Sequence, residues 1–208
     1  MTDKVIELRS ADFEEVTINK NEAFRYIGLR IKDADDTVKA LYDECLSLFS
    51  GAVNFRACFT KTDVAFLGDG ELDLGFGNFK SYNLEKNLGG CNEAYIFAAT
   101  AGIGVDRLIS RYSVVSPSKS VVIDAIGSAA IEGFCNKLNN ELKKGVFSKP
   151  RYSPGYGDLD IKQQKNILDF VDAHRKIGIA LSDSYMMTPT KSVTAIIGIN
   201  QSSETVFE

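Results

Sequence analysis

The N-terminal half of the chain changes between strand-like and helix-like spacing of its hydrophobic residues. Two segments in which apolar positions alternate, partly in residues 24–31 and more clearly in residues 53–60, predict strands. Between them, apolar residues recur every three or four positions in residues 33–49, which predicts an amphipathic helix that ends at Gly51. Residues 68–77 hold four glycines and predict hairpin turns with short strands on either side.

The middle of the chain predicts a strand followed by two helices. A short apolar run predicts a strand in residues 95–100, and a helix is expected to begin within residues 105–112. Ser116 can cap a further helix whose first residue is Pro117, a position at which the fixed φ and missing N–H of proline are tolerated. The pattern then allows one long helix as far as Lys144, with a glycine as its stop.

The C-terminal part predicts a loop, one more helix and the closing strands. The loop covers residues 148–159, and the helix runs from Asp160, its cap, to Gly178. Apolar segments then predict strands in residues 179–185, 192–199 and 205–207. Strands at both ends with long helices between them predict an α+β fold, in which helices pack on a twisted mixed or antiparallel sheet.

Composition and charge narrow the class of protein. The chain has 208 residues, of which 44% are hydrophobic and 25% are charged, and these values are ordinary for one globular domain. A net charge of −4 without a dense basic face argues against a nucleic-acid partner. No apolar run approaches the ~20 residues of a membrane span, and the start lacks an apolar signal-peptide core. We therefore expect a cytoplasmic protein that has no membrane partner, and four cysteines without C-x-x-C spacing predict no metal site.

The residues with the clearest chemical potential lie in the predicted loop. Residues 150–158 combine two prolines and two glycines, which fix the shape of a loop, with one arginine and two tyrosines. Arg151 can hold a carboxylate through a forked pair of charge-assisted hydrogen bonds, and a tyrosine can flank or stack on a purine. On spacing alone, the same residues also fit a simple turn between helices in which Arg151 pairs with a surface acid.

A resemblance to a known family favours the first interpretation. Arg151, Gly155 and Tyr156 have the spacing Arg-x-x-x-Gly-Tyr, which resembles the signature of the S-adenosylmethionine-binding activation (reactivation) domain of cobalamin-dependent methionine synthase. Upstream, residues 124–130 followed by Glu132 resemble the family's helix and its ligand-binding glutamate. Downstream, further blocks resemble the family's C-terminal half, namely residues 163–164, 177–181 and 187–193.

The resemblance implies how the chain is organised. It describes residues 1–208 as a single activation-domain-like unit, in which long helices pack on a twisted sheet. Residues 90–200 would form the part that binds S-adenosylmethionine. Residues 1–85 resemble the family only loosely and would form an N-terminal lobe.

The resemblance also assigns roles to individual residues. Arg151 would hold the methionine carboxylate of the ligand, Glu132 would accept hydrogen bonds from its polar end, and Tyr156 would position its adenosyl part. The complete predicted S-adenosylmethionine site consists of Glu132, Arg151, Tyr152, Ser153, Gly155 and Tyr156. A second set would line a corrinoid-docking face, namely Met187, Pro189 and Lys191. No catalytic residue and no metal ligand are expected.

The implied function is that of an accessory subunit of a methyltransferase. A free-standing activation subunit would support the reductive remethylation of cob(II)alamin that is held by a partner methionine synthase. The electron would come from a flavodoxin- or ferredoxin-like donor, and the methyl group from S-adenosylmethionine. Methyl transfer from a sulfonium needs no general acid or base, so catalysis would consist of proximity. The alternative is a non-catalytic adaptor or sensor that binds a corrinoid protein or an adenosyl ligand.

Helix geometry provides a test of this assignment. Glu132 would lie about 18 Å from the helix end at Lys144, at about 1.5 Å per residue. The seven residues from there to Arg151 can span about 23 Å when extended. We therefore predict that the chain returns along the long helix in a nearly extended path and brings Arg151 beside Glu132.

Overall fold

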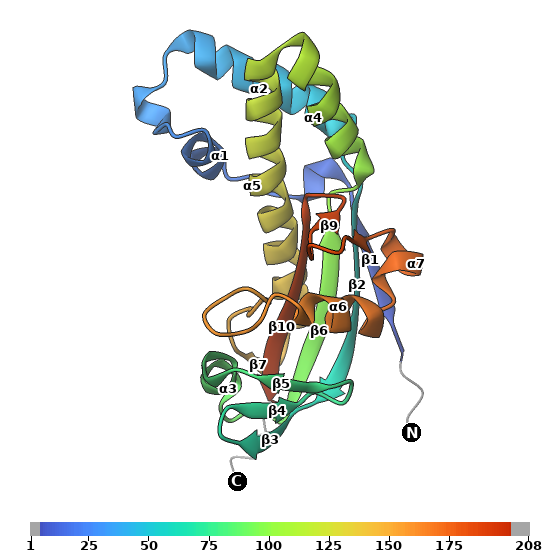
Figure 1. The fold of residues 1–208 in the computed structure, drawn as a ribbon. Coiled ribbons are helices and arrows are strands. Elements are labelled where there is room, and N and C mark those ends of the chain that lie inside the picture. The colour runs from blue at the N-terminus through green and yellow to red at the C-terminus, as the bar shows by residue number, and fades with distance from the viewer. Residues whose placement is uncertain (1–4, 201–208) are drawn as a thin grey trace.

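The computed structural model describes residues 5–200 and contains one main antiparallel sheet (Figure 1). Its five strands lie in the order β1-β2-β6-β10-β7, and every neighbouring pair is antiparallel. The strands are β1 (Glu7–Ala11), β2 (Phe55–Asp63), β6 (Glu93–Thr100), β10 (Ser192–Asn200) and β7 (Phe147–Ser148). The predicted α+β fold with helices on a sheet is confirmed, and among the described strands the pairing is antiparallel throughout.

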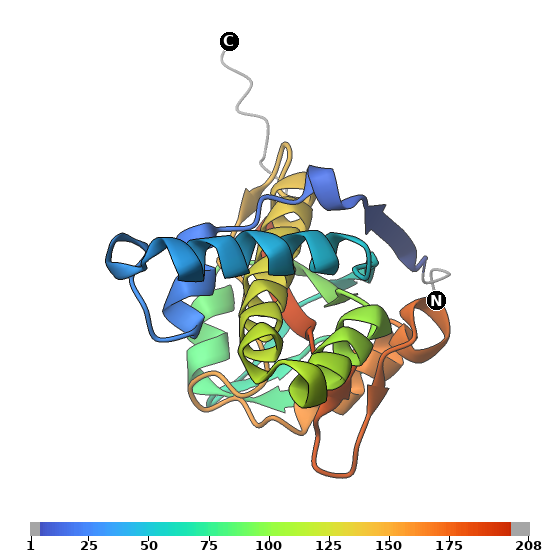
Figure 2. The same cartoon turned by 90° about the horizontal axis from the view of Figure 1, so that it is seen from above.

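Helices and loops cover both faces of this sheet, because side chains along its central strands alternate between two buried clusters. In β6, Phe97 and Ala99 belong to the first cluster, whereas Ile96 and Ala98 belong to the second. The helices of the first cluster are α1 (Lys20–Tyr26), α2 (Asp36–Ser50), α4 (Ile103–Val115) and α5 (Pro117–Leu142). Figure 2 shows α2 crossing over the long helix α5. The helices of the second cluster are α3 (Tyr82–Leu88), α6 (Gln163–Phe170) and α7 (Ala173–Ile177).

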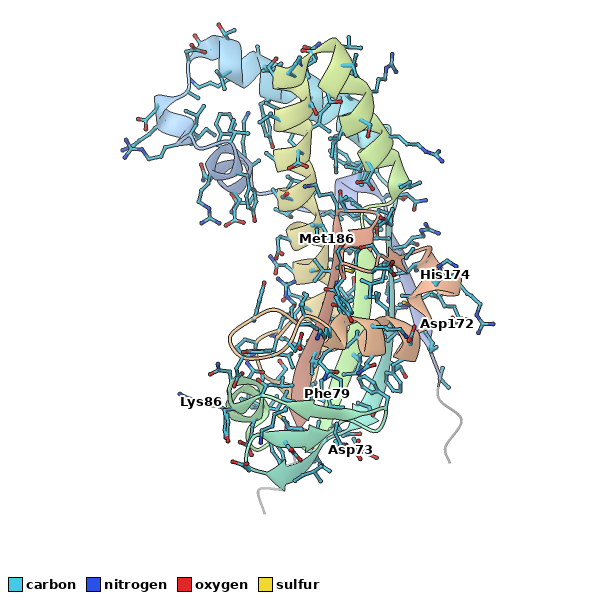
Figure 3. The ribbon with its side chains drawn as sticks, in the orientation of Figure 1. Asp73, Phe79, Lys86, Asp172, His174 and Met186 are labelled. Carbon is cyan, nitrogen blue, oxygen red and sulfur yellow. The ribbon has the colours of Figure 1, made fainter. Side chains whose placement is uncertain are left out.

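A small three-stranded sheet lies at one end of the main sheet, beside α3 (Figure 1). Its strands are β3 (Ala65–Gly68), β4 (Glu71–Asp73) and β5 (Asn78–Lys80), which confirms the hairpins predicted from the glycine-rich segment. Figure 3 marks Asp73 and Phe79 on this module, together with Lys86 on α3. Phe79 is fully buried, so it joins the module to the second cluster of the core. A separate two-stranded ladder pairs β8 (Ala180–Leu181) with β9 (Met187–Thr188).

The strand predicted in residues 24–31 is wrong. The chain forms α1 there and then a short 3₁₀ helix, η2 (Ile31–Asp33). Asn19 starts α1, because its side chain accepts hydrogen bonds from two backbone N–H groups of the first turn. Only Ala23 and Phe24 of this helix are buried, so the apolar alternation came from a helix with a narrow buried face. A second 3₁₀ helix, η1 (Phe13–Glu15), precedes α1.

The helix predicted from Asp160 to Gly178 is divided into α6 and α7. The break is at Asp172, whose φ of 52° lies in the left-handed region and ends the helical ladder. Gly178 ends α7 as predicted, again with a left-handed backbone. The strand predicted in residues 179–185 is reduced to β8, and the strand predicted in residues 205–207 lies outside the described residues.

The other elements agree with the sequence patterns. The amphipathic segment 33–49 forms α2, with Asp35 as its cap, and the apolar runs at 53–60 and 95–100 form β2 and β6. The helix expected within 105–112 is α4, which begins slightly earlier, at Ile103, and the long helix after Ser116 is α5. These two helices and the sheet position the loop that carries the candidate site.

Candidate functional site

After α5 the chain turns back and runs along the edge of the sheet. Phe147 and Ser148 pair with the end of β10, and Lys149 N donates to Gly198 O at 2.8 Å. Tyr152 then exchanges two backbone hydrogen bonds with Ile196, at 2.9 and 2.8 Å. Because β10 fixes this segment in an extended form, the return path is the one that the sequence arithmetic predicted. It places Arg151 against the side of α5.

Arg151 and Glu132 form an ion pair at this point. Arg151 Nη2 donates to Glu132 Oε2 at 2.8 Å, and the two side chains are 20% and 36% exposed. The other terminal nitrogen, Arg151 Nη1, is buried and has no hydrogen-bond partner within the described part of the chain. The guanidinium is therefore held in place through one nitrogen, while the hydrogen-bonding capacity of the second is not satisfied within the described residues.

The pair stands against the hydrophobic core. Cys135 follows Glu132 on α5 and is completely buried. Burial raises the pKa of its thiol to about 12, while the charge of Arg151 lowers it and that of Glu132 raises it. The thiol is thus neutral and unreactive at physiological pH. Arg151 and Glu132 are the two charged residues that shift the pKa of Cys135.

Two glycines give the loop beyond Arg151 its shape. Gly155 and Gly157 have φ values of 89° and 54°, a region that other residues rarely adopt. A Cβ at Gly157 would lie 2.5 Å from Asn83 Nδ2 and 2.6 Å from Tyr152 Oη, so a larger residue would displace both side chains. Tyr152 Oη donates to the carbonyl of Tyr156 at 3.1 Å, and the two rings meet edge to face. The loop is therefore tightly folded around Tyr152.

Asp158 attaches the loop to the start of α3. Its carboxylate accepts hydrogen bonds from Tyr82 N at 2.8 Å, from Asn83 N at 3.2 Å and from the Ser81 hydroxyl. The Ser81 hydroxyl, followed by the backbone N–H groups, holds the pKa of Asp158 below the ordinary value of an aspartate. These hydrogen bonds connect the position of the loop to an element that is 75 residues away in sequence.

A cavity of about 370 Å³ lies between α5 and this loop. Its lining comes from α5 and the residue after it, from the loop and from β10, namely Glu132, Asn136, Asn139, Lys143, Pro150, Arg151, Ser153, Tyr156 and Val193. The ring of Tyr156 is 58% exposed, so one wall of the cavity is an accessible aromatic surface. Within residues 5–200, two lining side chains carry a buried polar atom without a hydrogen-bond partner, Arg151 Nη1 and Asn139 Oδ1. Such atoms are the groups that a polar ligand would satisfy.

The cavity unites part of the predicted site. Glu132, Arg151, Ser153 and Tyr156 line it, whereas Tyr152 and Gly155 shape the loop from outside. Sequence reasoning missed five lining residues, namely Pro150, Val193 and a set of three along the long helix, Asn136, Asn139 and Lys143. These three follow Glu132 by four, seven and eleven positions, which is the spacing of one helix face, so the predicted helix already contained the signal that could have found them.

Two comparisons with known proteins bear on this arrangement. The sequence pattern of the family described as "Vitamin B12 dependent methionine synthase, activation domain" matches residues 136–207, which include Arg151, Gly155 and Tyr156. A crystal structure of the MetH reactivation domain bound to AdoHcy is similar over 96% of this chain and 80% of that chain, with a TM-score of 0.73 and 16% sequence identity. The chain has the fold of a methionine synthase reactivation domain. This finding confirms the resemblance seen in the sequence. A comparison with curated proteins gave no match.

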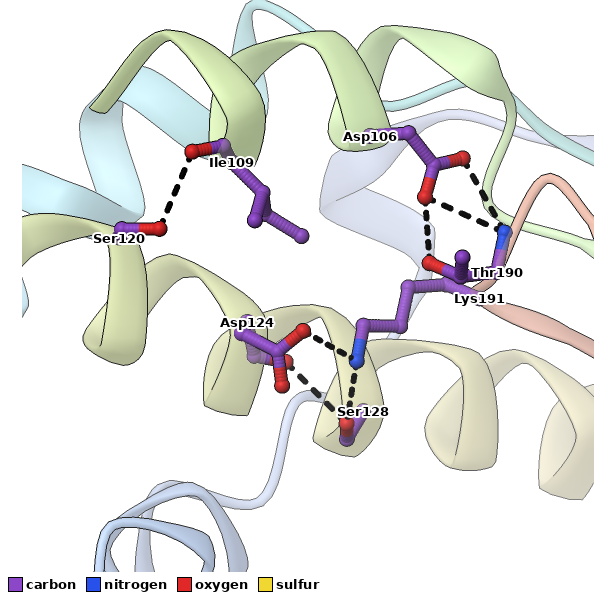
Figure 4. Close-up of polar contacts among 7 residues, drawn as sticks. All are labelled: Asp106, Ile109, Ser120, Asp124, Ser128, Thr190 and Lys191. Atoms are coloured by element: carbon purple, nitrogen blue, oxygen red, sulfur yellow. Dashed lines mark hydrogen bonds and ion pairs between the residues drawn. The ribbon is translucent and has the colours of Figure 1, made fainter. Parts of the chain in front are cut away.

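In this reactivation-domain fold, the residues predicted for corrinoid docking hold the connection between β9 and β10. Lys191 Nζ lies 2.8 Å from Asp124 Oδ1 and donates to Ser128 Oγ at 3.0 Å (Figure 4). Beside it, Thr190 N donates to both carboxylate oxygens of Asp106, at 3.2 and 3.1 Å. Figure 4 also shows Ser120 Oγ donating to Ile109 O at 3.0 Å, a bond that ties α5 to α4.

The three predicted docking residues differ in exposure. Pro189 is buried, Met187 is half-buried, and the side chain of Lys191 is only 13% exposed. Lys191 thus has a structural role, because it binds Asp124 and Ser128 of α5. Corrinoid docking at the three residues stays a prediction.

A larger cavity lies elsewhere in the reactivation-domain fold. It measures about 540 Å³ and is lined by residues of α6, α7 and the β8–β9 connection, among them His174 and Tyr185. Figure 3 shows His174 on α7 and Asp172 directly before it, and α7 packs on the opposite face of the sheet from α5. Lys165 and Asp169 on its wall neutralise each other at 2.6 Å, and no lining side chain carries a buried polar atom without a partner in residues 5–200. We therefore favour the smaller cavity, because its chemistry is incomplete without a ligand.

Two negative findings for the described residues concern metal sites and membrane-spanning helices. No group of three or more His, Cys, Asp or Glu side chains there could hold a metal ion. Among the helices within residues 5–200, none has the length and apolar character needed to cross a bilayer.

Proposed function

We propose that this chain binds S-adenosylmethionine in the cavity beside Arg151 and serves as an activation module for a cobalamin-dependent methionine synthase. The observation that carries the proposal is the Arg151 guanidinium. Glu132 holds one of its nitrogens at 2.8 Å, and the other is buried on the cavity wall without a partner. The signature that predicted this residue lies within the segment matched by the activation-domain family.

The charges of the cavity fit those of the ligand. S-adenosylmethionine carries a carboxylate, an ammonium and a sulfonium, so its site needs one cation and at least one acid. Arg151 Nη1 can donate to the carboxylate, while Glu132 can accept from the ammonium with the oxygen that Arg151 does not occupy. The exposed ring of Tyr156 can flank the adenine. A volume of about 370 Å³ is within the usual range of small-molecule sites, roughly 300–1,000 Å³.

The residues of this chain would act by binding and orientation. The ligand supplies a methyl group that its sulfonium has already activated, and the reduced cobalamin of the partner would receive it. Glu132 fixes the guanidinium before the ligand arrives, so little side-chain entropy is lost when the carboxylate binds. Val193 and Pro150 provide apolar surface that excludes water from the same wall. The contribution to the rate would be the placement of the methyl group.

The partners in this proposal are those that the sequence resemblance implied. They are a cobalamin-binding methionine synthase subunit and a flavodoxin- or ferredoxin-like electron donor. The solved relative supports only the ligand, since it is described as binding AdoHcy.

Calorimetric titration tests the binding step. We expect saturable binding of S-adenosylmethionine and of S-adenosylhomocysteine with one site per chain. If neither ligand binds at ~1 mM, a concentration that corresponds to a binding free energy of about −4 kcal/mol, the proposal is contradicted. A second assay mixes the protein with a cobalamin-binding methionine synthase, a reductant and methyl-labelled S-adenosylmethionine. Label on the corrinoid supports an activation module, whereas binding without transfer supports the adaptor or sensor alternative.

A further inference from the structure

The side chain of Asn139 is the least explained polar group in the cavity. It lines the same cavity as Arg151, and its Oδ1 is buried without a hydrogen-bond partner among the described residues. Leaving a buried amide oxygen unpaired is unfavourable, so most buried polar atoms in folded proteins have a partner. A ligand group that donates a hydrogen bond would remove this deficit.

The position of Asn139 on α5 relates it to the opposite end of the proposed ligand. It follows Glu132 by seven residues, which is two helical turns on the same face and about 10 Å along the axis. An adenosyl ligand whose amino-acid end lies at Glu132 and Arg151 has its purine at the other end. The purine would therefore lie along α5 in the direction of Asn139.

The other lining side chains of α5, and that of Lys143 after it, do not offer what the purine edge needs. An amide presents one acceptor and one donor side by side, and adenine presents the complementary donor and acceptor on its edge. Lys143 can only donate, and Asn136 is exposed, so water competes for its amide. The carboxylate of Glu132 already accepts from Arg151. Asn139 alone among these α5 residues combines a buried acceptor with the absence of a partner.

We propose that Asn139 recognises the 6-amino group of the adenine and makes the site specific for adenosyl ligands. This inference rests on the proposed function, because it requires the amino-acid end of the ligand to lie at Arg151. Asn139 is then a specificity-determining residue, and the methyl transfer itself does not involve it.

The test compares two ligands on three proteins by calorimetric titration. The ligands are S-adenosylhomocysteine and its 6-deamino analogue, in which hydrogen replaces the 6-amino group. The proteins are the unchanged chain, Asn139→Ala and Asn140→Ala. Asn140 is the neighbouring exposed asparagine, which lines a different cavity, so its variant controls for loss of an amide from the same helix.

We expect the unchanged chain and Asn140→Ala to bind S-adenosylhomocysteine about tenfold or more tightly than the analogue, since a paired amide and adenine edge discriminate by that amount. Asn139→Ala should bind both ligands equally, with the affinity that the unchanged chain has for the analogue. Loss of affinity for both ligands in equal proportion overturns the inference, and so does an unchanged preference.

The outcomes separate the two proposals. If S-adenosylhomocysteine binds in an Arg151-dependent way and Asn139→Ala keeps the preference, the inference fails and the proposed function stands. If neither ligand binds the unchanged chain, both fail. Thermal unfolding establishes whether Asn139→Ala is folded. If it is not, equal binding of the two ligands by the unchanged chain overturns the inference, and a preference for the 6-amino ligand supports it.

Discussion

Two acidic residues of the long helix α5, Asp124 and Glu132, each pair with a mostly buried cation from a distant segment, and the two pairs differ in one respect. Asp124 pairs with Lys191 at 2.8 Å, and Glu132 pairs with Arg151 at the same distance, about 12 Å further along the helix. Lys191 also donates to Ser128, and it has no unpartnered buried atom within residues 5–200. Arg151 retains a buried nitrogen without a partner on a cavity wall.

This difference separates a structural ion pair from a candidate binding pair. Lys191 directly precedes β10 and Arg151 follows the edge strand β7, and both side chains are mostly buried. Distance and burial alone would therefore give the two pairs the same role. The number of hydrogen-bond donors left over after folding is what distinguishes them, because a ligand binds to groups that the protein has not already satisfied.

The largest expected effect comes from removing the unsatisfied cation. Arg151→Ala should weaken binding of S-adenosylhomocysteine about ten- to a hundredfold, or about 1.5–3 kcal/mol, the range for a lost charged hydrogen bond. Calorimetric titration measures the change. Arg151→Lys should recover only part of the affinity, since lysine keeps the charge but cannot form the forked contact.

A matched control for this variant is Arg175→Ala. Arg175 also forms an ion pair, 2.9 Å from Asp172, but its side chain is 82% exposed and lies on the other face of the sheet. Its variant should bind as tightly as the unchanged chain. Equal affinity of Arg151→Ala and the unchanged chain would remove Arg151 from the site.

Local signals explain why much of the fold was predictable from the sequence. The long helix has a serine and a proline at its start, and the hairpin module has glycines at its turns, so short-range chemistry determines both. The meeting of Arg151 and Glu132 followed from a helix length and a loop length. The helix at Lys20–Tyr26 was mistaken for a strand, because a short helix with two buried residues produces almost no helical period.

Long-range contacts explain what could not be predicted. The helix spacing places Asn139 on the face of Glu132, but its burial depends on a loop that folds over α5 only in the tertiary structure. Likewise, Lys191 was expected on a docking face, although it pairs with Asp124, 67 residues earlier. The tertiary contacts of such a side chain cannot be predicted from a sequence pattern or a motif.

A smaller effect is expected from the structural pair. Lys191→Ala should lower the free energy of unfolding by about 1 kcal/mol, a value that allows for the exposure of Asp124, and should leave ligand affinity unchanged. Urea unfolding and calorimetric titration provide the two measurements, and Lys176→Ala, an exposed lysine, is the control. If Lys191→Ala weakened binding as strongly as Arg151→Ala, the two pairs would share a function and the distinction between them would be wrong.

The smallest effect concerns the anchor of the loop that carries Arg151. Asp158→Ala removes the carboxylate that accepts hydrogen bonds from Ser81 and from the first backbone N–H groups of α3. It should reduce stability, with a modest loss of ligand affinity because the loop is less well fixed. The pKa of Asp158 is lowered in the folded chain, first by the Ser81 hydroxyl, so its carboxylate favours the folded state. This contribution is complete above about pH 4, the ordinary value of an aspartate, and is lost as the pH falls through the lower folded value.

Urea unfolding between pH 7 and pH 3 should therefore show a constant stability difference between the unchanged chain and Asp158→Ala at neutral pH, and a narrowing difference below about pH 4. Asp183→Ala, which removes an exposed carboxylate from another loop, should show neither effect. A difference that is independent of pH would mean that the charge of Asp158 does not hold the loop. In that case the backbone conformation at Gly155 and Gly157, rather than the hydrogen bonds of Asp158 to the start of α3, would determine where Arg151 lies.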